Sequence, residues 1–346
     1  MFRKIREKTP KAAGYAMPAE YGEHDCCWMG WPENPLAWRG RHEEAKAAVA
    51  RLANTISEFE PVRMLVPEAS RKEATELCGS GVELIPMPID DGWLRDSGPT
   101  FLVGPSGELG AVDWIFNGWG DMEFAEWDRD RFTAERIGRL LEIPCFEPEL
   151  ITEGGALHVD GDGTVLCTKP TLMDPNRNPG MNIEDAERIL CDYLGVMKVL
   201  WLEEGFHQDE TGGHIDLIAS FSAPGRVLHL DTDNEADPNF AVFRKNIADL
   251  KSMTDARDRR LEVVSVPQPP ARHVGKRRLG LSYLNFYPAN GAIVMPAFGV
   301  EKDREAEAVF RREFPDREIV PFENAQILFH GGGGIHCLTQ QQPLAS

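Results

Sequence analysis

A weak internal repeat constrains the fold of this 346-residue chain more than any other feature of its sequence. Five copies share one pattern, in which an apolar strand is followed by a polar loop and by a Gly- or Asp-marked start of a second strand. Equivalent points in the five copies are separated by 52 to 71 residues, and they are Asp96, Gly154, His214, Asn285 and Cys337. Such a repeat indicates similar units that bury a shared core by packing against their neighbours.

Helical patterns fall between these copies. Apolar residues recur at helical spacing on a charged background in residues 41–59, 128–141, 182–194, 237–250 and 303–314. Asn182 and Asp185 predict the N-terminal cap of the third helix, and Gly195 predicts its end. The pattern therefore predicts five β-rich modules, each with a crossing helix, whose strand starts face one central cavity. The alternative is an ordinary pair of α/β domains without symmetry.

Composition and charge limit the classes of function. With 42% hydrophobic and 27% charged residues, the chain can bury a substantial core. The 56 Asp and Glu residues outnumber the 37 Lys and Arg residues, which gives a net charge of −19. This charge repels nucleic acids and anionic membranes and attracts cations, so we expect a small cationic partner.

Sequence signals for secretion and membrane insertion are weak. The basic start of the chain lacks the apolar run of a signal peptide. The uncharged residues 279–300 include Pro288 and Pro296, which predict strand, loop and strand rather than a spanning helix. The seven cysteines contain no CxxC pair, so they fit a reducing compartment better than a disulfide framework. We therefore expect a cytoplasmic protein.

Polar residues at the strand starts have the composition of a site for a planar cation. They are Asp96, Glu153, His214, Asp216 and Cys337. Two carboxylates can grip the N–H groups of a guanidinium in bidentate fashion. A thiolate can attack its central carbon, and an imidazole can transfer the protons.

Several of these residues also have a purely structural interpretation. Arg95 could pair with Asp96 in a turn, and Glu153 could be a solvated residue in a bulge. His214 and Asp216 are two residues apart on a predicted strand, so they would point to one face. This spacing could hold a metal, but no third ligand follows nearby, and the sequence predicts no metal site. His336 and most other histidines are interpreted as core or surface residues.

The functional interpretation is favoured for Cys337. Four glycines at residues 331–334 precede it, and a structural thiol does not need such a run. The run is not a phosphate loop, because no Lys-Ser/Thr pair follows it.

Motifs along nearly the whole chain resemble those of the agmatine deiminases, in the guanidino-modifying superfamily that also contains arginine and peptidyl-arginine deiminases. In chain order they are MPAEYGEHDCCWMGWPENPLAW, DDGWLRDSGPTF, DWIFNGWG, EGGALHVDGDGT, NRNPGM, SYLNFYPANG and GGGGIHCLTQQQP. The resemblance implies one domain over residues 1–346. Its fold would be a five-fold pseudosymmetric α/β propeller of ββαβ modules, called the pentein fold.

The resemblance also implies catalytic roles. Cys337 would be the nucleophile and His214 the general acid and base. Asp96 and Asp216 would hold the guanidinium nitrogens, and Glu153 would support the same head group. Neither a metal nor an organic cofactor would be required.

Three further residues are implied to contact substrate. Trp93 would lie against the aliphatic chain, Glu210 is a candidate partner of the distal amine of agmatine, and Trp119 would line the pocket. The chain departs from the family pattern at Gly212, Leu217 and Gly334. These departures bear on distal-end specificity more than on the reaction.

The implied activity is hydrolysis of agmatine to N-carbamoylputrescine and ammonia through an amidino-cysteine intermediate, as in putrescine biosynthesis. An alternative is deimination of peptidyl-arginine, free arginine or another guanidino compound. A remote alternative is a non-catalytic binding protein of the same fold. The resemblance also implies a homodimer or a higher homo-oligomer.

Overall fold

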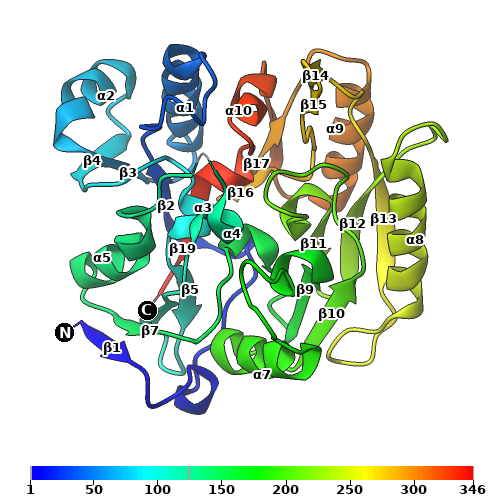
Figure 1. Cartoon of the computed structure of the whole chain (residues 1–346), viewed down its shortest axis with the longest axis horizontal. Helices are drawn as coiled ribbons and strands as arrows, with labels where there is room; N and C mark the ends of the chain where they lie inside the picture. Colours follow the sequence, from blue (N-terminus) through cyan, green and yellow to red (C-terminus); the bar gives the residue numbers. More distant parts are fainter. Residues whose placement is uncertain (1, 124, 346) are drawn as a thin grey trace.

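Five small sheets share one connection pattern in the computed structural model, which describes residues 2–123 and 125–345. In each sheet an antiparallel pair of strands is followed by a helix and then by a strand parallel to the second one. A parallel partner requires such a crossover, because a tight hairpin can join only antiparallel strands. The result is a mixed α/β fold whose long helices lie around the outside, with α3 (Leu94–Ser97) near the centre (Figure 1).

The first sheet joins the two ends of the chain. The C-terminal strand β19 (Thr339–Pro343) pairs antiparallel with β2 (His24–Gly30), and α1 (His42–Ile56) leads from β2 to β3 (Val62–Val66). A fourth strand, β4 (Val82–Pro86), extends this sheet. Its pairing order is β19-β2-β3-β4.

The other four sheets repeat the pattern in chain order. The second contains β5 (Thr100–Val103), β6 (Leu109–Val112), α5 (Thr133–Leu140) and β7 (Pro144–Phe146), with β1 (Arg3–Ile5) parallel to β7. The third contains β8 (His158–Val159), β9 (Thr164–Thr168), α7 (Ile183–Leu194) and β10 (Lys198–Leu202). The fourth contains β11 (Ala219–Ala223), β12 (Arg226–Asp231), α8 (Asn239–Ser252) and β13 (Glu262–Pro267). The fifth contains β16 (Tyr287–Ala289), β17 (Ala292–Pro296), α9 (Lys302–Glu313) and β18 (Glu318–Phe322).

Shorter elements connect the modules. The ribbon β14 (His273–Val274) and β15 (Arg277–Arg278) precedes the fifth sheet. The short helices are α2 (Arg71–Leu77), α4 (Gly118–Asp121), α6 (Lys169–Leu172) and α10 (Gln326–His330). The 3₁₀ turns are η1 (Lys11–Ala13), η2 (Glu68–Ser70), η3 (Asp130–Phe132), η4 (Gly154–Ala156), η5 (Ile215–Leu217) and η6 (His336–Leu338).

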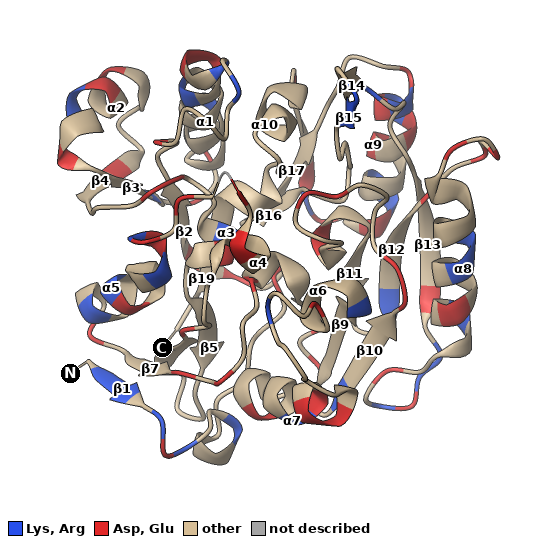
Figure 2. Cartoon of the chain, in the orientation of Figure 1, with Lys and Arg blue, Asp and Glu red and all other residues tan. Residues whose placement is uncertain are grey.

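The five predicted helices are confirmed, and α7 shows why they form where they do. The Asn182 side chain accepts a hydrogen bond from the Asp185 N–H, which caps the first turn. Gly195 ends the helix at a φ of 68°, a left-handed conformation that costs glycine little. The apolar stripe of α7, formed by Ala186, Ile189, Leu190 and Leu194, is buried. Charged residues lie along outer helices such as α5, α7 and α8 (Figure 2).

The strand predicted around His214 and Asp216 is wrong. His214 caps the 3₁₀ turn η5, which contains Asp216, and β11 begins only at Ala219. The loop before this turn contains two glycines with positive φ, Gly212 and Gly213, which make a tight turn rather than an extended strand. Across residues 2–123 and 125–345, no helix is long and apolar enough to span a bilayer.

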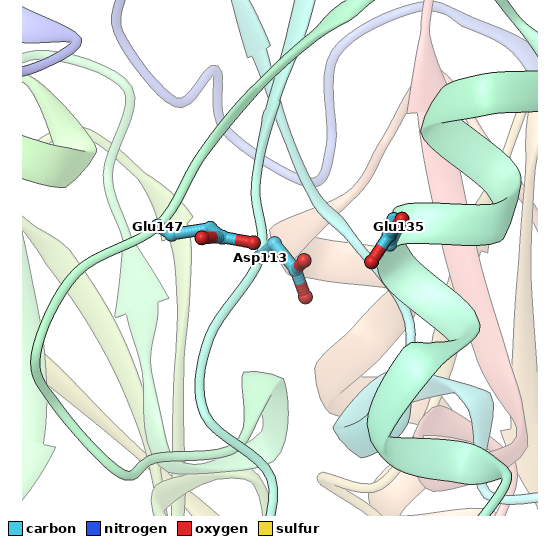
Figure 3. A group of neighbouring side chains, drawn as sticks. All are labelled: Asp113, Glu135 and Glu147. Atoms are coloured by element: carbon cyan, nitrogen blue, oxygen red, sulfur yellow. The ribbon is translucent and has the colours of Figure 1, made fainter. Parts of the chain in front are cut away.

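The N-terminal strand β1 is held by an ionic cluster. Asp113, Glu135 and Glu147 approach one another beside it (Figure 3). The Lys4 ammonium forms ion pairs with both Glu135 and Glu147. Its Nζ lies 2.6 Å from Glu135 Oε2 and 4.0 Å from Asp113 Oδ2. An ammonium therefore compensates the negative charge of this group.

Candidate active site

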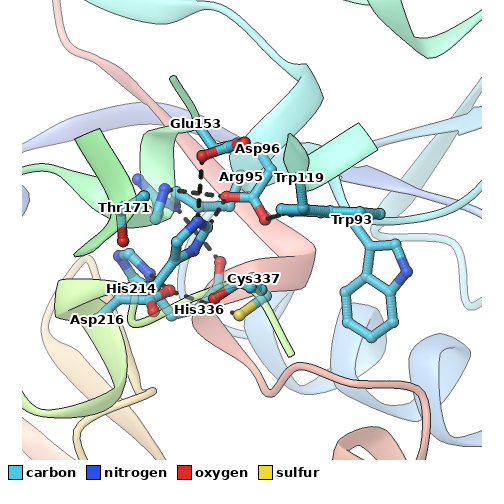
Figure 4. Close-up of polar contacts among 12 residues, drawn as sticks. Trp93, Arg95, Asp96, Trp119, Glu153, Thr171, His214, Asp216, His336 and Cys337 are labelled. Carbon is cyan, nitrogen blue, oxygen red and sulfur yellow. Dashed lines mark hydrogen bonds and ion pairs between the residues drawn. The ribbon is translucent and has the colours of Figure 1, made fainter. Parts of the chain in front are cut away.

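The turns that precede the first strand of four of the five sheets meet in the middle of the molecule. α3 contacts η6 and η4, and η4 contacts η5. These turns bring together Asp96, Glu153, His214, Asp216 and Cys337, each at most 4% exposed (Figure 4). A pocket lined in part by Trp93 and Trp119 reaches Asp96 and Cys337.

Cys337 lies in η6, with polar partners on two sides of its sulfur. Asn285 Nδ2 donates a hydrogen bond to Cys337 Sγ at 3.3 Å, and Sγ lies 3.4 Å from Asp216 Oδ2. Burial raises the pKa of the Cys337 thiol well above its ordinary value, and the carboxylates of Asp216 and Asp96 raise it further. The thiol is therefore protonated in the empty pocket, and a bound cation would favour the thiolate.

His214 is surrounded by carboxylates. Its Nε2 lies 3.3 Å from Glu153 Oε2, and its Nδ1 lies 3.9 Å from Asp96 Oδ1. Burial alone would lower the pKa of His214, but the charges of Asp96 and Glu153 outweigh it and raise the pKa to about 9. Nδ1 has no hydrogen-bond partner among the described residues, so this site presents an imidazolium with one unused donor.

Asp96 and Asp216 differ in how their oxygens are held. Asp96 Oδ2 accepts a hydrogen bond from Trp119 Nε1 at 2.8 Å, and Oδ1 accepts one from the Gly155 N–H at 2.9 Å. Burial raises the pKa of Asp96 to about 6, although His214 opposes this shift. Asp216 Oδ2 is engaged by His336 Nδ1 at 2.8 Å, whereas its buried Oδ1 lacks a partner within the described part of the chain.

Glu153 is fully buried and holds His214 rather than lining the pocket. Arg177 Nε donates hydrogen bonds to both of its oxygens, at 2.8 and 3.2 Å. Burial alone would raise the pKa of Glu153, but His214 and Arg177 outweigh it and lower the pKa. The solvated position considered from the sequence is thus wrong. Arg95 also pairs with Glu20 rather than with Asp96, at 3.2 Å between Nη1 and Oε1.

Comparisons with known proteins show the family to which this chain belongs. Residues 16–343 match the model of the Porphyromonas-type peptidyl-arginine deiminase family. The chain belongs to that family. It is 46% identical to a relative from Legionella pneumophila (strain Paris), with 97% of each chain covered. It is 38% identical to the agmatine deiminase of Ectopseudomonas mendocina (strain ymp), again with 97% of each covered. The solved agmatine deiminase of Enterococcus faecalis superposes with a TM-score of 0.94 at 34% identity, covering 99% of both chains.

In this deiminase-family member, glycines leave room for the reactive groups. A Cβ added at Gly155 would lie 2.6 Å from His214 Nδ1, 2.8 Å from Asp96 Oδ1 and 3.0 Å from Asp216 Oδ2. A Cβ at Gly333 would lie 2.8 Å from Cys337 Cβ and 2.8 Å from the Trp93 ring. The backbone of the glycine run thus approaches Cys337 and the Trp93 ring closely.

We expect Gly155→Ala to lower kcat by about 100-fold, because an added methyl group must displace three polar groups at once. The measurement is the steady-state deimination rate at saturating substrate. Gly280→Ala is the matched control, since the nearest atom to its added Cβ is Leu217 Cδ1 at 3.4 Å, an ordinary contact. A Gly155→Ala enzyme with wild-type kcat would show that these groups tolerate displacement.

The pocket wall is aromatic and its mouth is charged. Trp93 stacks on Trp38, with ring centroids 5.0 Å apart. At the mouth, Arg39 Nη2 donates to Glu210 Oε1 at 2.8 Å, and Arg277 Nη1 donates to Glu210 Oε2 at 2.9 Å. Glu210 lines the pocket, but both of its oxygens already have arginine partners, and its contact with a substrate amine stays a prediction.

The three family departures lie at different depths. Gly212 has a φ of +86°, and a Cβ there would lie 3.2 Å from Arg177 Nη1. Leu217 is buried in η5. A Cβ at Gly334 would lie 2.5 Å from Asn285 Oδ1 and from the Phe329 ring, so the present packing admits only glycine.

Not every residue that shapes the site is evident from the sequence. Asn285 is one of the five equivalent repeat points and lies in the SYLNFYPANG motif, but neither pattern indicates that its amide contacts Cys337 Sγ. Arg177 lies in the NRNPGM motif, which marked its region but not its contact with Glu153. His336 was interpreted as an ordinary histidine, but it is 3% exposed and contacts Asp216. Its position next to Cys337 was the available signal.

The charges of Asp96 and His214 predict a bell-shaped pH dependence of kcat/KM. In the role implied by the resemblance, Asp96 is ionised to attract a guanidinium, so we expect activity to fall as the pH drops through about 6. In its implied role His214 is protonated to donate to a leaving amine, so we expect activity to fall as the pH rises through about 9. The measurement is kcat/KM from pH 4.5 to 10.5. A flat profile between pH 5 and 10 would contradict these assignments.

Proposed function

We propose that this protein hydrolyses agmatine to N-carbamoylputrescine and ammonia, a reaction that serves putrescine formation. The observation that carries the proposal is the convergence of Cys337, His214, Asp96 and Asp216 in one buried cluster that a tryptophan-lined pocket reaches. Relatives over 97% of the chain are named agmatine deiminases, which supports the same substrate class. The acidic composition also suits a dicationic substrate.

Binding of the guanidinium orients its central carbon. Asp96 Oδ1 and the free Asp216 Oδ1 accept hydrogen bonds from guanidinium nitrogens, and their charge compensates the bound cation. This cation lies beside the Cys337 thiol and favours release of the thiol proton to solvent. The thiolate therefore forms where its target carbon is already held, which converts attack into an intramolecular step.

Thiolate addition and loss of ammonia form the covalent intermediate. Cys337 Sγ bonds to the guanidinium carbon and gives a neutral tetrahedral adduct. His214, charged at neutral pH, donates a proton to one amino nitrogen, and that C–N bond breaks to release ammonia. A positively charged amidino-thioether remains on Cys337, and His214 is left neutral.

Hydrolysis reverses the roles of the same groups. Neutral His214 takes a proton from water as the water oxygen adds to the amidino carbon. The C–S bond of the second adduct then breaks as its remaining hydroxyl proton passes to the departing sulfur, which releases the ureido product and restores the Cys337 thiol. Glu153 stabilises the imidazolium at both stages through its contact with Nε2. Water is the only reactant that these steps need besides the chain and its guanidino substrate.

The distal ammonium of agmatine lies toward Glu210 in this proposal, with its aliphatic chain between Trp93 and Trp119. Glu210→Gln is expected to raise KM for agmatine about 10-fold with little change in kcat, because the amine lies far from the reacting carbon. Steady-state kinetics measure the split. Glu203→Gln is the control, since Glu203 pairs with Lys169 away from the pocket. An unchanged KM would place the amine elsewhere.

Free arginine is the second candidate substrate, because a cation lines the pocket mouth. Arg39 could meet the α-carboxylate of free arginine. However, its guanidinium already donates to Glu210 Oε1 and, at 2.7 Å, to the His330 carbonyl oxygen. The charged pocket mouth therefore favours agmatine over arginine. A peptidyl-arginine substrate would have to pass the side chains of Arg39, Glu210 and Arg277.

A substrate comparison tests the proposed function. Ammonia release and ureido-product formation are measured with agmatine, arginine and N-benzoyl-arginine amide, with Cys337→Ser as the control. Turnover of agmatine that is lost in the variant is the expected result. Turnover of another guanidine alone would overturn the substrate and retain the mechanism. No turnover of any substrate would favour the non-catalytic alternative.

We further infer that the five sheets surround a pseudo-five-fold axis in one domain over residues 1–346, as in the pentein fold. Support comes from their shared connection pattern and from the contacts of α3, η4, η5 and η6, which begin successive modules. Homo-oligomerisation and a cytoplasmic location stay predictions of the sequence.

A further inference from the structure

A buried histidine lies directly behind one of the guanidinium-binding carboxylates. His336 Nδ1 lies 2.8 Å from Asp216 Oδ2, and His336 Nε2 lies 2.8 Å from Glu20 Oε2. The three side chains are at most 3% exposed. The mechanism proposed above uses only Asp216 of this group, so the other two residues need an explanation.

The two partners determine the charge of His336. A carboxylate accepts hydrogen bonds, and a neutral imidazole can donate from only one nitrogen. Both ring nitrogens of His336 face carboxylate oxygens, so both carry a proton and the ring is an imidazolium. Arg95 Nη1 lies 3.2 Å from Glu20 Oε1, and its positive charge keeps Glu20 ionised. Arg95, Glu20, His336 and Asp216 thus form a row of alternating charges.

This row ends at Asp216 Oδ2, the oxygen that also lies 3.4 Å from Cys337 Sγ. Asp216 Oδ2 is fixed by His336, while the buried Asp216 Oδ1 is left without a partner in the described residues. An unpaired buried carboxylate oxygen is costly unless a ligand satisfies it. The row therefore presents one oxygen of an ionised, immobile carboxylate for a cationic ligand.

We propose that Glu20 and His336 are positioning residues, which keep Asp216 ionised and turn its free oxygen toward the guanidinium. This inference rests on the proposed function, because it assigns a role to Asp216 in binding that substrate. Glu20 and His336 touch neither substrate nor reacting atoms. They act through Asp216 alone.

Other titratable groups also face this row, and the test has to separate them. On the substrate side they are Asp96, His214 and Cys337, and on the far side they are Arg95 and His158. Burial raises the pKa of Asp96 to about 6, so Asp96 dominates the acid limb of the wild-type profile. Burial alone would raise the pKa of Asp216, but His336 and His214 lower it. Loss of the His336 charge would therefore raise the pKa of Asp216.

The experiment is the pH dependence of agmatine kcat/KM for His336→Asn, Glu20→Gln and the double variant. Asparagine keeps a donor near the position of Nδ1 but removes the charge. For His336→Asn we expect the acid limb to move up by about one pH unit and to become steeper, since two coupled carboxylates then titrate together. Glu20→Gln should shift the limb less, and it should add no further shift to His336→Asn.

His229→Asn is the matched control, because His229 is equally buried on β12 and contacts the Leu230 carbonyl rather than a catalytic carboxylate. An acid limb that stays in place in both single variants would overturn the proposal, even if kcat/KM falls uniformly. Should His336→Asn fail to fold, the presence or absence of an acid-limb shift in Glu20→Gln decides the proposal.

A wild-type enzyme inactive on agmatine would instead show that the proposed function has failed. In that case the positioning role of Glu20 and His336 is tested by the pH dependence of guanidine binding, which is compared between Cys337→Ser and the Cys337→Ser, Glu20→Gln double variant.

Discussion

Replacing Cys337 with serine is expected to lower the rate of agmatine deimination by at least about 10⁴-fold. A buried hydroxyl has a far higher pKa than a thiol, and the site holds no base suited to ionise it. His214 cannot serve, because the surrounding carboxylates, acting against burial, raise its pKa to about 9 and keep it protonated at neutral pH. Agmatine binding should persist, since serine differs from cysteine by one smaller atom and Asp96 and Asp216 are unchanged.

Two measurements check this expectation. Ammonia release gives the loss of turnover, and calorimetric titration of the serine variant with agmatine gives the retained affinity. Cys78→Ser is a control for cysteine substitution, because Cys78 is half-buried at the end of α2, outside the site. Residual turnover within 100-fold of the wild type would contradict nucleophilic catalysis by Cys337.

Replacing His214 with asparagine is expected to lower kcat by roughly 10²–10⁴-fold, the usual contribution of a general acid and base. Both half-reactions need the imidazole, first to protonate the departing ammonia and then to accept a proton from water. The alkaline limb near pH 9 should disappear with it, because the group that titrates there is gone. The remaining activity should still fall below about pH 6, where Asp96 takes up a proton.

The shape of the profile separates this role from a structural one. A general loss of packing would scale kcat/KM down and leave both limbs in place. His207→Asn is a suitable control, since His207 is exposed in the loop after β10. An alkaline limb that persists near pH 9 in His214→Asn would assign that titration to another group.

Features that depend on short stretches of chain could be predicted from the sequence. The cap at Asn182 and the left-handed end at Gly195 are set by residues within α7 or beside it, so both boundaries of that helix were predicted correctly. The residue types of the candidate site could also be predicted from short stretches of the sequence. A thiol after four glycines and carboxylates at the strand starts are visible in the chain before it folds.

Protonation states and pairings were decided by the tertiary structure. His336 and Glu20 are 316 residues apart in the chain, yet together with Asp216 they fix the charge of a buried imidazole. Glu210, a candidate partner of the distal amine in the sequence, is held by Arg39 and Arg277 from distant segments. A periodicity of two placed His214 and Asp216 on a strand, but two left-handed glycines make a turn there instead.

The sequence by itself determined which reactive groups this protein carries and the order of its helices, because residue types and local backbone preferences are properties of short segments. Only the tertiary structure decided which oxygen of Asp216 stays free and why His214 is charged. Those properties depend on burial and on the sum of charges within a few ångströms, contributed by turns that stand about 60 residues apart in the chain. They exist only after the turns have met.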